Sequence, residues 1–220
     1  MRAPVIGEKL YPLTLSGTCS KPAKDTTWAG VQKSIQIQAA CLDAMWQPVV
    51  EAAGATWRKP VLLFYSDPIR RSPCGPSPDK DKAPAHYCAG NQTIYISDAV
   101  TDPVVRYRML GFEVIAHEYT HHVQELTGIL TAASAQGRGD LTTRRIELQA
   151  HCMAYVAMQA MDGLAVTARE WDQLRSSWNY SGDPAGHGSA EAQLYWGSRA
   201  LKATSLAACD TFSVSEDLVT

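Results

Sequence analysis

Five consecutive residues near the middle of the chain have the types and spacing of a metal site. Residues 117–121 read His-Glu-Tyr-Thr-His, so the two histidines are four residues apart. On a helix this spacing places both imidazoles on one face, where two ring nitrogens can bind one zinc ion. Glu118 falls beside the metal, where its carboxylate can accept a proton from zinc-bound water. The motif therefore predicts a hydrolytic zinc centre.

Bound zinc would supply the chemistry of hydrolysis. It lowers the pKa of its water to roughly 7 and polarises the carbonyl group that the water attacks. The competing interpretation of the motif is a set of ordinary surface or core histidines. The adjacent His122 lies on a different helix face from His117 and His121, so we expect it to pack in the core or to support a ligand.

The third metal ligand has to come from outside the motif. A catalytic zinc usually has three protein ligands and one open position. Glu147 follows His121 after 25 intervening residues, on a later helical pattern, and packing of the two helices would bring its carboxylate to the metal. Taken alone, a glutamate on a helix is usually solvated. His151, one turn later on the same face, is the rival ligand, or it could orient a ligand instead.

Peptide hydrolysis also needs a donor for the oxyanion that forms as water attacks. His187, between two glycines, is the candidate, with Tyr180 and Tyr195 as alternatives. An equally good interpretation of His187 is a loop histidine that caps or packs the following helix. The strand expected at 93–97 could offer its edge to an extended peptide.

Apolar periodicity and short apolar runs predict the elements that position these side chains. The motif helix is expected to begin at Asp102 and Pro103, as N-cap and first turn, and to end near Gly128. The helix that carries Glu147 should start at Asp140 or Thr142. The other expected elements are helices over about 27–54, 167–179 and 188–203, a buried strand over 61–65 and a second strand over 93–97.

Two further features complete the expected architecture. The first helix should be interrupted at Pro48, and residues 1–26, rich in Pro, Gly, Ser and Thr, should form an extended arm pinned by Cys19. The pattern contains no internal repeat. We therefore expect one α+β domain over residues 1–220, mainly α, with a small β-sheet and a long active-site helix.

Composition excludes several classes of protein. The 220 residues are 45% hydrophobic and 19% charged, with a formal net charge of -2, as in an ordinary soluble globular protein. The chain has no cluster of Lys and Arg interleaved with aromatics, so we expect no nucleic-acid partner. It also has no apolar run long enough for a transmembrane segment. Nothing in the pattern indicates an oligomeric state.

The six cysteines indicate the cellular compartment of the protein. They form an even set with no Cys-x-x-Cys pair, which favours three disulfides over thiolate metal ligation. Six reduced thiols in a cytosolic protein are the alternative. Residues 1–9 contain no apolar segment of the kind found in signal peptides. We therefore expect a secreted or extracytoplasmic protein from which the signal peptide has been removed.

Two segments of the chain resemble a known family. Residues 117–124 and 147–152 are similar to the bacterial putative neutral zinc metallopeptidase family, the YpfJ-like proteins. Smaller similarities occur at residues 87–88, 187–189 and 209–212, and the helix around residues 41–42 resembles that of secreted actinobacterial members.

The resemblance implies a zincin-like fold with zinc as the cofactor, peptide-bond hydrolysis of a peptide or protein substrate, and Glu147 as third ligand. It also implies disulfides between Cys74 and Cys88 and between Cys152 and Cys209. Cys19 is then left to pair with Cys41.

Two residues depart from the family pattern. His151 stands where members usually have Asp, and Thr120 where they usually have a small residue. In related zincins an acid one turn after the ligand Glu holds a zinc-binding histidine. An imidazole at this position, as in His151, could weaken metal affinity or activity.

Two other functions follow from these features. The first is a catalytically weak or inactive zinc-binding module derived from a peptidase, in which Glu118→Gln would change nothing. The second is a cysteine hydrolase that uses Cys152 with a histidine, which requires a free thiol.

Overall fold

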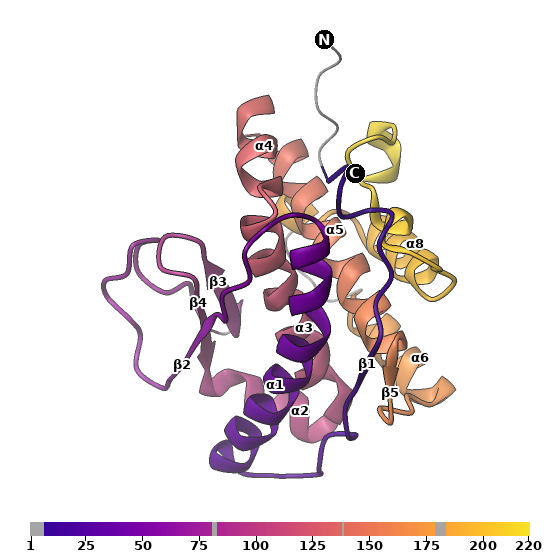
Figure 1. Cartoon of the computed structure of the whole chain (residues 1–220). Coiled ribbons are helices and arrows are strands. Elements are labelled where there is room, and N and C mark those ends of the chain that lie inside the picture. The colour runs from indigo at the N-terminus through magenta and orange to yellow at the C-terminus, as the bar shows by residue number, and fades with distance from the viewer. Residues whose placement is uncertain (1–6, 81–82, 138, 179–183) are drawn as a thin grey trace.

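The computed structural model describes residues 7–80, 83–137, 139–178 and 184–220 (Figure 1). Its central feature is the packing of α3 (Arg108–Leu126) against α5 (Asp140–Gln159). Around this pair lie α1 (Trp28–Ala52), α2 (Thr101–Arg106), α4 (Ile129–Gln136), α6 (Ala168–Trp178), α7 (Pro184–His187) and α8 (Ala190–Ala200). The fold is mainly helical α+β and zincin-like, as expected.

Helix α1 runs through Pro48 without a break, so the predicted interruption is wrong. Thr27 caps its first turn, where its hydroxyl accepts a hydrogen bond from the Gly30 N–H at 3.1 Å. Proline has no N–H, so the carbonyl of Ala44 loses its helical partner. Both Pro48 and Ala44 are exposed, and water can therefore satisfy that carbonyl. The buried Val49 and Val50 hold the last turn in the core.

The predicted motif helix is two helices in the structure. The break is at Tyr107, whose backbone is extended (φ -135°, ψ 88°). Helix α2 already begins at Thr101, so Asp102 lies in its first turn and is not its N-cap. Helix α3 ends at Leu126, as expected, because Gly128 adopts a left-handed conformation (φ +76°) that few other residues accept. The short α4 that follows was not predicted.

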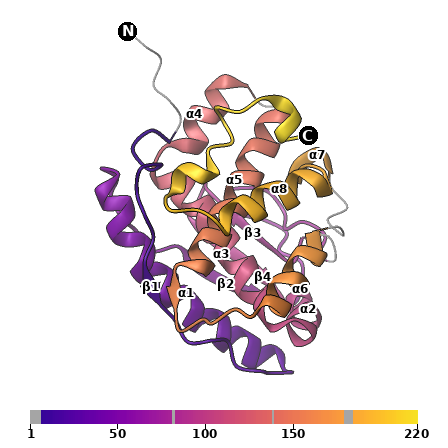
Figure 2. The same ribbon diagram turned by 90° about the vertical axis from the view of Figure 1, so that its right-hand side faces the viewer.

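Helix α5 is buried on nearly every face from Leu148 to Met158 and passes through the core. Its N-cap is Gly139, and Asp140 is its first residue. The C-terminal segment crosses over it (Figure 2). There Arg145 donates to the carbonyls of Thr211 and Val214, and the Thr211 hydroxyl donates to the Arg145 carbonyl. These bonds hold α5 in place along its first turns.

Strands β2 (Val61–Tyr65), β3 (Ala85–Cys88) and β4 (Thr93–Ser97) form a sheet beside the helices (Figure 1). The order is β2-β4-β3, with β2 parallel and β3 antiparallel to β4. Two predictions are corrected by this order. Strand β2 lies at an edge, with Val61 57% exposed, and is not the buried strand. Strand β4 is central and fully paired, so it has no edge to offer to a peptide.

Of the predicted N-terminal arm, residues 7–12 form turns, and residues 13–26 follow the helices as an extended segment. Its strand β1 (Gly17–Thr18) pairs in parallel with β5 (Met161–Asp162), directly after α5. Disulfides join Cys19 to Cys41, Cys74 to Cys88 and Cys152 to Cys209, which confirms the implied pairing. None of the six cysteines, all within the described residues, is free. The cysteine-hydrolase interpretation is therefore wrong, because Cys152 has no thiol.

Removal of the disulfide between Cys152 and Cys209 is expected to destabilise the fold strongly. The bond spans 57 residues, and constraint of a loop of this length in the unfolded chain contributes about 4 kcal/mol. Urea unfolding of the double Ala variant should show this loss. The disulfide between Cys74 and Cys88 spans 14 residues, so the free energy of unfolding of its double Ala variant should fall by about 3 kcal/mol. An unchanged unfolding midpoint in the first variant would contradict the expectation.

Among the described residues, no helix has both the length and the apolar character needed to cross a membrane.

Candidate metal centre

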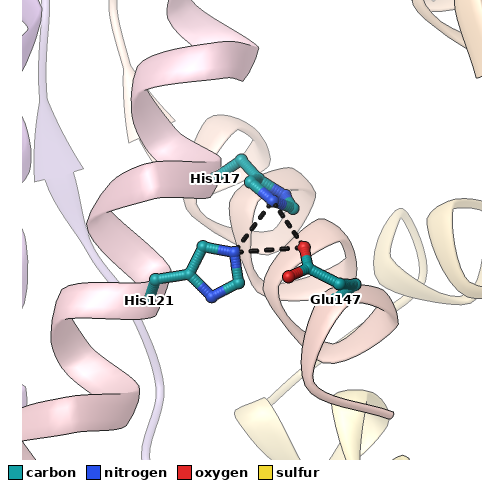
Figure 3. A group of neighbouring side chains, drawn as sticks. All are labelled: His117, His121 and Glu147. Atoms are coloured by element: carbon teal, nitrogen blue, oxygen red, sulfur yellow. Dashed lines mark hydrogen bonds and ion pairs between the residues drawn. The ribbon is translucent and has the colours of Figure 1, made fainter. Parts of the chain in front are cut away.

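Three predicted ligands converge between α3 and α5 (Figure 3). The Nε2 atoms of His117 and His121 are 3.0 Å apart. The Oε2 atom of Glu147 lies 3.2 Å from the first and 3.1 Å from the second. Among the described residues this is the group of His, Cys, Asp and Glu side chains that could hold a metal ion.

The dimensions of this triangle suit zinc. With ligand bonds of about 2.0 to 2.1 Å, two ligand atoms of a tetrahedral site lie about 3.3 Å apart. The three sides of 3.0 to 3.2 Å are close to that spacing. Two imidazoles and one carboxylate are a donor set found in catalytic zinc sites, which keep their fourth position open. The residues present therefore fit a zinc ion.

The electrostatics of the group also favour a cation. Burial opposes ionisation of Glu147, but the adjacent His121 and His117 hold its pKa well below the ordinary value. Burial lowers the pKa of His117 to about 4. Burial also acts against the charge on His121, but the carboxylates of Glu147 and Glu118 raise its pKa to about 9. A carboxylate that stays ionised beside two imidazole nitrogens is suited to hold a cation.

Glu118 lies on α3 beside this group and outside it. It is 7% exposed and lines the same cleft as His117 and Glu147. Burial and the nearby Glu147 charge raise its pKa to about 7, against the opposing effects of His121 and of the Tyr87 N–H. That N–H belongs to β3 and donates a hydrogen bond to the carboxylate. Strand β3 therefore helps to hold the predicted general base.

A cleft of about 750 Å³ opens over the ligands. This volume lies within the usual range of ligand pockets. Part of its wall comes from Val100, Pro103, Tyr107, Leu110 and Val114, on η1 (Asp98–Val100), α2, α3 and the residue between the two helices. The start of β3 contributes Ala85, and the end of α6 contributes Ser177. The break at Tyr107 thus serves the site, because it brings this side chain to the cleft.

His151 is not part of the three-ligand group. Its Nδ1 lies 3.8 Å from Oε1 of Glu113, and its ring lies against Tyr155. Burial and His117 lower the pKa of His151 to about 3, so the ring is neutral. Burial and Glu118 raise the pKa of Glu113 to about 7. The structure therefore brings Glu147, and not the rival His151, to the two motif histidines.

The other histidine of the motif and the unusual threonine have structural partners. His122 is fully buried, with Nδ1 2.9 Å from the Tyr87 hydroxyl and Nε2 2.6 Å from the Arg58 carbonyl. It packs in the core, as expected. The hydroxyl of Thr120 donates to the Ala116 carbonyl at 3.0 Å, so α3 accommodates this residue without an unpaired polar group.

The candidates for the oxyanion donor differ in their distance from the cleft. His187 was expected in a loop, but it is the last residue of the short α7. Its Nε2 lies 3.5 Å from Oε2 of Glu147, at the cleft, with 47% of the side chain exposed. Tyr195 packs on Trp196, and it lines a separate depression on α8 and not the cleft, so that candidate is wrong. Tyr180 lies outside the described residues.

Three residues near the centre were not assigned a role from the sequence. Glu113 and Gln124 lie on α3, four residues before His117 and three after His121, and this helical spacing is the signal that could have found them. The Oε1 atom of Gln124 lies 2.8 Å from Nδ1 of His121. Tyr87 acts through its backbone, for which its residue type carries no signal.

Known proteins resemble this chain over most of its length. The uncharacterized protein YpfJ of Escherichia coli K12 is 28% identical over 198 residues, which cover 77% of this chain and 67% of YpfJ. The uncharacterized protein Mb2605 of Mycobacterium bovis is 27% identical over 207 residues, which cover 80% of this chain and 68% of that protein. Neither name states an activity. No solved structure matches the chain significantly.

The match to a family includes the whole candidate centre. Residues 20–212 match the family described as putative neutral zinc metallopeptidase, and this span contains both ligand-bearing helices, β3 and the walls of the cleft. The chain therefore belongs to the putative neutral zinc metallopeptidase family.

Proposed function

We propose that this protein is a zinc-dependent endopeptidase whose metal is held by His117, His121 and Glu147. The observation that carries the proposal is the convergence of these three side chains below an open cleft, with Glu118 beside them. The family, described as putative neutral zinc metallopeptidase, supports a zinc-dependent peptidase.

Each side chain at the centre has a proposed role. Zinc bound at the centre would activate a water molecule and polarise the scissile carbonyl. Glu118 would act as the general base and would carry the proton to the leaving amine. The proposed donor of a hydrogen bond to the oxyanion is His187, which lines the cleft beside Glu147.

The substrate that we propose is an extended peptide or a protein segment. A cleft of about 750 Å³ has room for residues on both sides of the cleaved bond. An endopeptidase needs neither terminus of its substrate, so peptides blocked by N-acetyl and C-amide groups should be cleaved. Cleavage of free peptides only would show an exopeptidase.

The compartment that we propose is extracytoplasmic. Three disulfides support it, because such bonds persist in oxidising surroundings.

Removal of the metal is expected to abolish hydrolysis reversibly. Incubation of the purified protein with 1,10-phenanthroline should eliminate cleavage of an unstructured protein substrate, and added zinc should restore it. The isomer 1,7-phenanthroline, which does not chelate, serves as the control. Full activity in the metal-free protein would overturn the proposal.

A zinc-binding module without catalytic activity is the second candidate. The observation in its favour is His151, a neutral imidazole one turn after the ligand Glu147. Such a module would bind zinc at the same three side chains and cleave none of the substrates tested.

A further inference from the structure

A chain of buried side chains leads away from the candidate ligand His121. Its Nδ1 lies 2.8 Å from Oε1 of Gln124. The Gln124 amide nitrogen donates to Oε1 of Gln149 at 2.9 Å, and the Gln149 amide nitrogen donates to the Tyr11 hydroxyl at 2.7 Å. Tyr11 in turn bonds the carboxylate of Asp210. Gln124 and Gln149 are fully buried, and Tyr11 is 6% exposed.

The direction of every bond in this chain is determined. The Gln124 amide nitrogen also lies 3.0 Å from the backbone carbonyl of Ile146, which can only accept. The group that faces this carbonyl must therefore be the NH2, and the oxygen of the Gln124 amide must face His121. It follows that the Nδ1 of His121 carries the hydrogen and donates it.

This assignment has a direct consequence for metal binding. With the hydrogen on Nδ1, a neutral His121 ring presents the lone pair of Nε2 to the ligand group. Gln124 also bonds the carbonyl of the residue directly before Glu147, so one amide contacts both ligand-bearing helices. Each later member donates in the same sense. The chain ends on Asp210, a carboxylate that accepts and has no hydrogen to place.

We infer that Gln124, Gln149 and Tyr11 are positioning residues that set the tautomer and ring orientation of His121 for metal binding, an inference that rests on the proposed function. This series of hydrogen bonds links the centre to the N-terminal arm, through Tyr11, and to the C-terminal segment, through Asp210. Both segments are distant from the motif in sequence, and neither reaches the metal group itself.

Metal affinity tests this inference without any substrate. The variants Gln124→Met and Gln149→Met keep the side-chain length and remove the amides, and Tyr11→Phe removes one hydroxyl. Zinc affinity, measured by competition with a chromophoric chelator, should fall roughly 10- to 100-fold in Gln124→Met. The loss should be smaller in Gln149→Met and smallest in Tyr11→Phe. Gln38→Met, at a buried glutamine on α1 outside the chain, should bind zinc like the wild type.

A second readout separates positioning from general stability. Nitrogen-15 NMR of the zinc-loaded wild type should show a slowly exchanging Nδ1 hydrogen on His121, and Gln124→Met should lose that protection. If a folded Gln124→Met binds zinc as tightly as wild type, the inference fails and the proposed function stands. If Gln124→Met does not fold, Tyr11→Phe becomes the test. The inference would be overturned if Tyr11→Phe had the zinc affinity of the wild type and its His121 Nδ1 hydrogen exchanged as slowly as in the wild type. If the wild type itself binds no zinc, the proposed function fails first.

Discussion

Replacement of Glu118 by glutamine is expected to abolish hydrolysis and to leave the metal in place. Glutamine has nearly the same shape but cannot accept the proton of the water, and loss of a general base typically costs 10²- to 10⁴-fold in rate. We expect kcat/KM to fall by roughly this factor. The zinc content should remain that of the wild type, because Glu118 lies outside the three-ligand group. Both quantities can be measured on one preparation.

The matched control is Glu125→Gln. This residue lies on the same helix, two turns later, and does not line the cleft. The control should keep both zinc and activity. Undiminished hydrolysis in Glu118→Gln would exclude its role as general base. If the wild type binds zinc but cleaves nothing, the zinc-binding module is the correct function.

Replacement of Glu147 by alanine is expected to remove the metal itself. Its Oε2 lies within 3.2 Å of both imidazole nitrogens, so its loss leaves a two-ligand site. We expect zinc affinity to fall by more than the roughly 10- to 100-fold that changes around a ligand cause. Hydrolysis should be lost with the metal. Isothermal titration of the metal-free variant with zinc measures the effect.

The comparison variant is His151→Ala, which removes the rival ligand from the same helix. Its zinc affinity should fall much less than that of Glu147→Ala, because His151 lies against Glu113 and Tyr155 and outside the ligand group. The reverse order of the two affinities would show that His151, and not Glu147, completes the site.

Much of the candidate centre could be predicted because its chemistry depends on local spacing. Residues four apart share a helix face whatever the rest of the chain does, so His117 and His121 had to lie together once α3 formed. The side of the helix on which Glu118 lies follows from the same periodicity. The role of Glu147 was less accessible, because it depends on how α5 packs against α3.

The predictions were wrong where the structure of a segment depends on parts of the chain that are distant in sequence. Which strand is central depends on pairing between β2, β3 and β4, and the residue pattern of each strand alone contains no information on that order. The continuation of α1 through Pro48 is possible because Ala44 is exposed, which is a property of the packed helix. Tyr195 was expected at the cleft on residue type alone, but the orientation of α8 turns it away.

The supporting side chains show the same limit. Gln124 lies three residues after His121, so its contact with that ring could be anticipated. Its partners Gln149 and Tyr11 come from α5 and from the N-terminal arm, and only the folded chain brings them together.

The most direct test of the central claim is a crystal structure of the chain grown with zinc, with anomalous diffraction data collected at the zinc edge. We predict one anomalous peak per chain, bonded to Nε2 of His117, Nε2 of His121 and the carboxylate of Glu147 at about 2.0 to 2.2 Å, with Glu118 beside it. A peak held by other side chains, or none between α3 and α5, would contradict the account.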